Sequence, residues 1–216
     1  MRIGVGVTTT DTRKNHFNKW MDSYQLFTKP EYNLFVAHNQ PTIAAAKNLC
    51  LIALEHCDYI FLFDDDCFIA NSEWAEYCID THLNTGEHHF LYLKDSLHQF
   101  YRQEQGIRHY FRCGGCFMFL TKEVIKTVGG FNKGYKKYGF EHAGYSNRIH
   151  SAGLTSSNYL MPVDLGNYLF SLDYDGDVAG LKHYPSYIDD MNNIESYIDY
   201  NRQVFQDDIK TIYQPL

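Results

Sequence analysis

Three consecutive carboxylates, Asp64, Asp65 and Asp66, stand directly after the apolar segment YIFLF at residues 59–63. Negative charges this close repel one another unless a cation or hydrogen bonds compensate them. Carboxylate oxygens suit a hard divalent cation such as Mg²⁺ or Mn²⁺. Alternation along the strand turns Asp64 and Asp66 to one side and Asp65 to the other. The triplet therefore predicts a metal site on Asp64 and Asp66, with a solvated acidic loop as the alternative.

The hydrophobic pattern of the first half shows which elements must position this triplet. Residues 2–7, 32–38 and 59–63 are short apolar runs that predict strands. Residues 16–28 have apolar side chains at helical spacing, and residues 43–56 are rich in strong helix formers. Strands and helices that alternate in this way predict parallel strands joined by crossover helices. The expected fold class is therefore α/β, with a mostly parallel central sheet flanked by helices.

Polar segments follow the carboxyl ends of all three predicted strands. TTTDTR follows the first strand, HNQPT overlaps the end of the second, and the aspartate triplet follows the third; a further helix then begins, with Asn71 as its predicted N-cap. In sheets of this kind ligands bind beyond the carboxyl ends of the strands. We therefore expect the three polar segments to meet along one edge of the sheet and to form a binding site.

The second half of the chain has a less regular pattern. Residues 88–94 and 109–121 predict strands, and Thr121 is placed to cap a short helix. Residues 141–153 predict a helix that Gly153 closes, and residues 194–212 predict a broken amphipathic helix. The acidic cluster DYDGD between these helices is typical of a flexible lid or a turn.

Composition limits the classes of function. The chain has 216 residues and a formal net charge of −7, which gives no broad basic surface for nucleic acid. No apolar run approaches the roughly 18 residues that span a bilayer, so we expect a cytoplasmic protein, with peripheral membrane association left open. Cys113 and Cys116 form a CxxC that would suit redox chemistry or half a zinc site. Because no second CxxC is present, we expect reduced, largely buried thiols instead.

Several motifs resemble those of family 2-like glycosyltransferases with the GT-A fold. YIFLFDDD resembles their DxD motif, and IAAAKNLCLIAL resembles their AxARN helix, with Lys47 and Asn48 at the arginine and asparagine positions. The segment from residue 112 to residue 153 resembles their acceptor-side block. The matching positions are Gly115, Gly130, Phe131, Asn132, Gly139, Glu141, Asn147 and Arg148. These matches keep their order over residues 2–153.

The resemblance implies a donor site that holds a nucleotide-sugar, with a UDP-sugar favoured, through Mn²⁺ or Mg²⁺. Asp66 would be the principal metal ligand, Asp64 would face the metal or the ribose, and His183 would add a further ligand. His38 stands where the family usually carries a base-reading Asp. The residues implied in donor binding are Thr8, Thr9, Thr10, Arg13, His38, Asn39, Lys47, Asp64, Asp65 and Gly115.

The resemblance also implies a catalytic base. The acceptor-side E-D pair of the family is Glu141-His142 here, and the replaced Asp is the usual base of inverting members. A histidine with an ordinary pKa near 6.5 can accept a proton at neutral pH. Glu141, near a predicted helix start, is the other candidate. A third interpretation is that His142 only packs or forms a hydrogen bond.

The resulting expectation is a single GT-A domain, Rossmann-like in its layering, over residues 1–216. It divides into a nucleotide-sugar-binding half (1–95), an acceptor and catalytic half (96–185) and a C-terminal helical segment (186–216). The expected reaction moves a sugar from a nucleotide-sugar to a hydroxyl of a glycan or other acceptor, with inversion. The alternatives are a sugar-phosphate nucleotidyltransferase and a non-catalytic module that binds a glycan or nucleotide. Nucleic acid is a minority acceptor, given the acidic chain.

Overall fold

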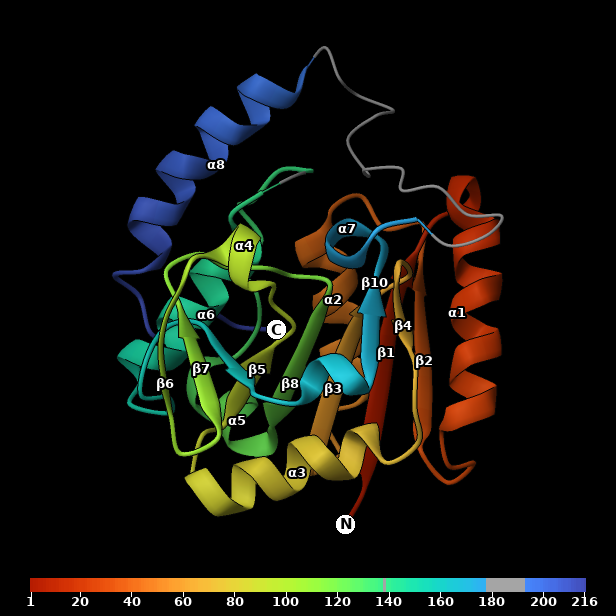
Figure 1. Cartoon of the computed structure of the whole chain (residues 1–216). Coiled ribbons are helices and arrows are strands. Elements are labelled where there is room, and N and C mark those ends of the chain that lie inside the picture. The colour runs from red at the N-terminus through yellow and green to blue at the C-terminus, as the bar shows by residue number, and fades with distance from the viewer. Residues whose placement is uncertain (138, 178–192) are drawn as a thin grey trace.

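A five-stranded sheet forms the centre of the computed structural model, which describes residues 1–137, 139–177 and 193–216 (Figure 1). The strands lie in the order β2-β1-β3-β8-β5. β1 is parallel to β2 and β3, whereas β8 is antiparallel to both β3 and β5. Four strands therefore point the same way, as expected, and β8 runs against them. Their bounds are β1 Ile3–Thr9, β2 Asn33–His38, β3 Tyr59–Asp64, β5 His89–Leu91 and β8 Phe117–Thr121.

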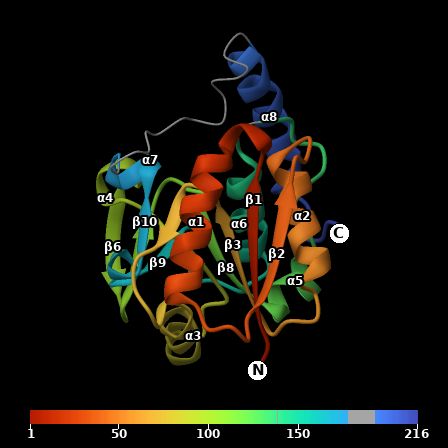
Figure 2. The same ribbon diagram turned by 90° about the vertical axis from the view of Figure 1, so that its right-hand side faces the viewer.

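Helices cover both faces of this sheet, which confirms the expected α/β class. Figure 2 shows the sheet edge-on, with α1 and α3 on one face and α2, α5 and α6 on the other. The β1–α2 packing is close, because a Cβ at Gly6 would lie 2.7 Å from the Cβ of Cys50. The helices are α1 Lys14–Phe27, α2 Ile43–Ala53, α3 Trp74–Thr85, α5 Lys122–Val128, α6 Glu141–Ser151 and α8 Ile194–Asp208.

Smaller elements surround the sheet. A three-stranded sheet has the order β6-β7-β9, and β4 pairs with β10 in a two-stranded ribbon. The DYDGD cluster, expected as a lid or turn, begins within a short helix, α7. The bounds are β4 Cys67–Ile69, α4 Asp95–His98, β6 Phe100–Glu104, β7 Ile107–Tyr110, β9 Leu160–Pro162, β10 Leu169–Ser171, α7 Leu172–Asp175 and the 3₁₀ turns η1 Asp11–Arg13 and η2 Leu165–Asn167.

Two predicted caps are corrected. α3 starts at Trp74 with Glu73 as its N-cap residue, at a φ of 65°, so Asn71 lies outside the helix. Thr121 does precede α5, but its hydroxyl contacts Nδ1 of His88 at 2.8 Å and makes no capping bond. At Thr121 a side-chain contact between elements therefore replaced the local capping bond.

The cysteines are free thiols, and all but the half-buried Cys113 are buried, as the sequence predicted. Burial raises the pKa of Cys50 to about 12, so this thiol stays protonated at neutral pH. Within the described part of the chain, no helix combines the length and the apolar character that crossing a membrane requires.

The buried imidazole of His89 makes the free energy of unfolding depend on pH. Its Nδ1 contacts the Phe119 carbonyl and its Nε2 the Ser146 hydroxyl, both at 2.9 Å. Burial lowers the pKa of His89 to about 4. Because the folded pKa lies below the unfolded value of about 6.5, the unfolded chain binds the proton first as pH falls. We expect this histidine alone to remove up to about 3 kcal/mol of unfolding free energy between pH 6.5 and pH 4.

Urea denaturation across this pH range tests the prediction in the native chain and in His89→Gln. The variant should be less stable at pH 7.5 but should lose less stability on acidification. Equal acid slopes in the two proteins would show that His89 does not carry the effect.

Candidate active site

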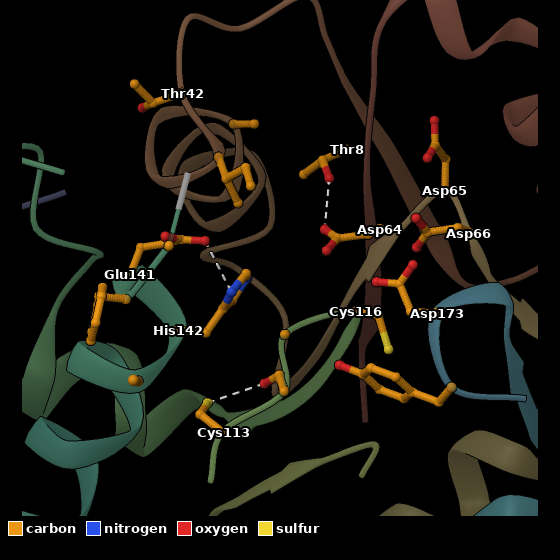
Figure 3. Close-up of a pocket in the computed structure, with 18 of the residues that line it drawn as sticks. Thr8, Thr42, Asp64, Asp65, Asp66, Cys113, Cys116, Glu141, His142 and Asp173 are labelled. Carbon is orange, nitrogen blue, oxygen red and sulfur yellow. Dashed lines mark hydrogen bonds and ion pairs between the residues drawn. The ribbon is translucent and has the colours of Figure 1, made fainter. Parts of the chain in front are cut away.

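A cavity of about 800 Å³ opens where β1 and β3 end and where β8 and α6 begin (Figure 3). All three members of the aspartate triplet line it, together with the Glu141-His142 pair. The three polar segments expected at one edge of the sheet do converge here, because both β2 and β3 are parallel to β1. The other predicted site residues on the cavity wall are Thr8, Thr9, Thr10, Arg13 and Gly115.

Asp64 ends β3 and is held from two sides. The Thr8 hydroxyl donates to its Oδ1 at 2.9 Å, and the Lys47 ammonium lies 2.8 Å from the same oxygen. Burial acts to raise the pKa of Asp64, but the charge of Lys47, the nearby His142 and the hydrogen bonds from Lys47 and Thr8 together lower it. Lys47 is fully buried and also donates to the Gly115 carbonyl at 3.1 Å. Its side chain therefore lies behind the cavity wall, and its predicted contact with donor remains a prediction.

Asp65 and Asp66 share one arginine. Arg13 reaches Asp65 through Nε and Asp66 through Nη2, each at 2.6 Å, and the Thr9 hydroxyl donates to Asp65 at 2.7 Å. The expected alternation is therefore wrong, because β3 ends at Asp64 and the chain turns at the next two residues. Burial raises the pKa of Asp65 to about 7 against the opposing charge of Arg13.

A fourth carboxylate, Asp173, joins the triplet from α7. Its side chain faces Asp66 and Asp64 in Figure 3, and the Leu172 amide donates to the Asp66 carbonyl at 3.0 Å. Burial, followed by the negative charges of Asp66 and Asp64, raises the pKa of Asp173 to about 7. Asp173 belongs to the DYDGD cluster but was not predicted in the site, because nothing local in the sequence shows that α7 folds back onto the end of β3.

The charge of this cluster fits a divalent cation. Four carboxylates, Asp64, Asp65, Asp66 and Asp173, stand against two cations, Arg13 and Lys47. Burial is the largest cause of the raised pKa of Asp65 and of Asp173, and the neighbouring carboxylates raise both further. In the described ranges, no group of three or more His, Cys, Asp or Glu side chains has the arrangement of a formed metal site. The predicted ligand His183 lies outside the described residues.

The Glu141-His142 pair starts α6. Nδ1 of His142 lies 3.1 Å from Oε1 of Glu141, and the ring stands edge-on to Phe131. Within the described residues, Glu141 Oε2 and His142 Nε2 have no hydrogen-bond partner although both atoms are buried. A carboxylate that orients an imidazole and leaves its other nitrogen available is an arrangement suited to proton transfer.

Gly115 separates this pair from the aspartates. A Cβ on Gly115 would overlap the His142 ring, while the Gly115 carbonyl accepts from Lys47, which in turn binds Asp64. We expect Gly115→Ala to displace the imidazole and to lower kcat by about 10- to 100-fold, in keeping with the cost of a 1 Å misplacement. Product formation by chromatography measures this. Gly166→Ala, where a Cβ meets nothing within 4 Å, is the matched control; similar losses in both variants would contradict the prediction.

His38 and Asn39, the residues predicted beside the nucleotide base, lie outside the set that lines the cavity. Both contact Asp11: the Asn39 amide donates to Oδ2 at 2.7 Å, and His38 Nε2 lies 3.2 Å from Oδ1. Asn39 also has a φ of 53°, in the left-handed region. The two side chains brace the loop after β1, and their contact with a base stays a prediction.

Comparison with known proteins adds independent findings. A family model described as the N-terminal domain of galactosyltransferase matches residues 96–170. An uncharacterised glycosyltransferase of Acanthamoeba polyphaga mimivirus is 26% identical over 188 residues, which cover 78% of this chain and 72% of the viral protein.

Solved structures show a similar architecture. S. aureus TarS 1-349 superposes with a TM-score of 0.56 at 12% identity, over 79% of this chain and 60% of that one. The catalytic domain of Drosophila β1,4-galactosyltransferase 7, in complex with xylobiose, gives a TM-score of 0.46 at 18% identity, over 71% of this chain and 63% of that one. The chain thus spans less than two thirds of either solved protein.

Both matches in sequence are to glycosyltransferases. The family match covers the segment that contains Gly115, Glu141 and His142, and the viral relative extends the likeness over most of the chain. The likeness to TarS agrees with the central sheet flanked by helices.

Proposed function

We propose that this chain is a metal-dependent, inverting glycosyltransferase that moves a sugar from a nucleotide-sugar, with a UDP-sugar favoured, to an acceptor hydroxyl. The observation that carries the proposal is one cavity with two chemically different ends. An acidic cluster with excess negative charge stands at one end, and the Glu141-His142 pair stands at the other, with Gly115 between them. Both proposed halves, residues 1–95 and 96–185, contribute side chains to this cavity.

The acidic end binds the donor in this proposal. Asp64, Asp66 and Asp173 would hold Mn²⁺ or Mg²⁺, since hard cations prefer carboxylate oxygens. When bound, the cation supplies positive charge for the departing diphosphate. Thr10 and Arg13 line the same end, where a hydroxyl and a guanidinium suit the nucleotide's ribose and phosphates.

The other end activates the acceptor. The acceptor oxygen attacks the anomeric carbon as the bond to the diphosphate oxygen breaks, and the diphosphate leaves with that electron pair. The hydroxyl proton passes to Nε2 of His142, whose Nδ1 side is held by the Glu141 carboxylate at 3.1 Å. Glu141 also stabilises the imidazolium that forms. Because attack and departure lie on opposite sides of the carbon, the configuration inverts.

Removal of the base should slow the reaction without loss of donor binding. We expect His142→Gln to lower kcat about 100-fold, a usual contribution of general base catalysis. Glu141→Gln should lower it less, because the imidazole remains. Steady-state transfer assays give kcat, and nucleotide-induced thermal stabilisation serves as the binding control. Unchanged kcat in both variants would remove the pair from the mechanism.

The proposed function as a whole is tested with a panel of nucleoside diphosphates and nucleotide-sugars, each with Mn²⁺ and with EDTA. A ligand that binds only the folded chain raises its melting temperature. We expect stabilisation by one nucleotide that requires the metal, followed by slow hydrolysis of its sugar donor. The anomeric configuration of the product, read by NMR, decides inversion. Pyrophosphate release would instead indicate a nucleotidyltransferase, and binding without hydrolysis a non-catalytic module.

A further inference from the structure

One part of the cavity wall carries polar groups that the proposed mechanism does not use. His98 at the end of α4, Arg112 and Gly114 in the loop before β8, and Tyr174 in α7 all line the cavity. These four residues, here called the loop wall, come from three segments. None of them belongs to the predicted donor or base residues.

His98 presents a fixed N–H group in this wall. Its side chain is only 6% exposed, and the Lys94 amide lies 2.8 Å from Nδ1. The Lys94 carbonyl is 3.1 Å from the same nitrogen, but the amide is nearer and can only donate. Nδ1 therefore carries the lone pair, and in the neutral ring Nε2 carries the hydrogen. Among the described residues Nε2 has no hydrogen-bond partner.

Gly114 leaves space directly in front of this N–H group. A Cβ at Gly114 would lie 2.9 Å from Nε2 of His98 and 2.5 Å from the hydroxyl of Tyr174. The rings of His98 and Tyr174 meet edge to face, with centroids 4.7 Å apart. Two hydrogen-bonding atoms from separate elements thus border one small hollow of the cavity, and the glycine keeps that hollow open.

Arg112 adds positive charge beside the hollow. The neighbouring hairpin arginines are paired, Arg102 with Glu104 at 3.0 Å and Arg108 with Asp95 at 3.3 Å. Arg112 forms no such ion pair with any carboxylate of the described ranges, although its side chain is exposed and lines the cavity. The Arg112 amide donates to the His98 carbonyl at 3.0 Å, so the two residues are neighbours. Burial and, after it, the charge of Arg112 lower the pKa of His98.

We propose that the loop wall is an acceptor subsite for a carbohydrate that carries an anionic group, a carboxylate or a phosphate, which Arg112 pairs with while His98 donates from Nε2. The inference rests on the proposed function for its assignment to the acceptor. An anion fits because a cation, a neutral N–H donor and a hydroxyl converge at this wall. The carboxylate next to it in the chain, Asp173, belongs to the proposed cation site. The subsite therefore sets specificity, and the Glu141-His142 pair performs the proton transfer.

The test compares ligands of nearly equal shape and different charge. Methyl β-glucuronide and methyl β-glucoside differ only at C6, and glucose 6-phosphate provides the phosphate alternative. Their dissociation constants are measured by ligand-observed NMR without any donor. We expect the preferred anionic sugar to bind at least about tenfold more tightly than the glucoside at moderate salt. The stronger of the two anionic ligands identifies the group.

Variants assign this preference to the loop wall. Arg112→Gln should abolish it, Arg112→Lys should restore part of it, and His98→Phe should weaken it. Arg108→Gln, in β7 and outside the cavity lining, should keep the preference for the anionic sugar. Equal affinity for charged and neutral sugars, or the same preference in Arg112→Gln, would overturn the inference. A raised KM for the nucleotide-sugar alone in Arg112→Gln would also overturn it, because the arginine would then serve the donor.

The two proposals fail separately. Asp66→Asn should keep the anion preference, because Asp66 lies at the donor end of the cavity. Donor hydrolysis by the native chain without any anion preference would leave the proposed function standing and end the acceptor inference. Conversely, the native chain could bind anionic sugars and lose that binding in Arg112→Gln while no nucleotide raises its melting temperature. That result would end the proposed function and leave the anion site standing.

Discussion

Asp66→Asn is expected to lower kcat by at least roughly 1,000-fold, which corresponds to about 4 kcal/mol of transition-state stabilisation. The substitution keeps the shape of the side chain but removes one negative charge from the proposed cation site. The Asp65 carboxylate, 2.6 Å from Nε of Arg13, still binds that arginine. Transfer at saturating donor and Mn²⁺ measures the loss.

Mn²⁺ binding, compared across variants, separates loss of the cation from loss of structure. Mn²⁺ binding, followed by electron paramagnetic resonance, should weaken in Asp66→Asn and in Asp173→Asn. Arg13→Gln should keep Mn²⁺ binding, because it removes only the competing cation. Asp22→Asn, on α1 and outside the cavity lining, serves as the matched control for a lost carboxylate. Full turnover in Asp66→Asn would remove the metal from the proposal.

The central part of the site could be predicted from sequence because its determinants are local. Apolar runs with helices between them define three parallel strands, and that topology alone brings Thr8 and Asp64 into contact at 2.9 Å. The turn after Asp64 was missed, because strand periodicity says where side chains point only while the strand continues. Arg13 then pairs with both following carboxylates, which the pattern assigned to opposite sides.

Other parts depend on contacts between distant segments. The β6 strand is exposed along its whole length, so its sequence, FYRQE, lacks the alternation that marks a half-buried strand. Asp173 reaches the triplet because α7 packs back over it, across more than a hundred residues. The Lys94 amide donates to Nδ1 of His98 and thereby leaves the hydrogen of the neutral ring on Nε2. The sequence did not predict this contact, because α4 has only four residues and is too short to show a periodic pattern.

Gly115 explains why the two ends of the cavity act as one site. Its carbonyl receives the buried Lys47, which holds Asp64, and its missing side chain makes room for His142. A shift of Gly115, just before β8, would therefore move both the proposed base His142 and the donor-side Asp64. Coupling of this kind needs a rigid support beneath α6, and the buried ion pair between α6 and α8 provides one.

Arg148→Met should reduce the free energy of unfolding by about 3–5 kcal/mol, the usual cost of breaking a buried ion pair from one side. Arg148 and Asp208 are both buried, with Nε 3.1 Å from Oδ1. The guanidinium also donates to the backbone carbonyls of Val128, Gly130 and Ile212. Without it, the Asp208 side chain keeps, among the described residues, its hydrogen bond from Tyr135 at 2.9 Å, so an uncompensated charge remains inside the protein.

The double variant Arg148→Met with Asp208→Leu should recover part of that loss, because it leaves no buried charge, although the three carbonyls stay without the arginine. Urea denaturation of the native chain, both single variants and the double variant completes the cycle and gives the coupling energy. We expect this coupling to exceed about 1.5 kcal/mol, above the range of exposed pairs. The exposed pair Arg202–Asp199, at 2.9 Å on α8, is the matched control and should give less than about 0.5 kcal/mol. If both pairs gave the same small coupling, the α6–α8 contact would be apolar packing alone, and α8 would not hold the start of α6 in place through charge.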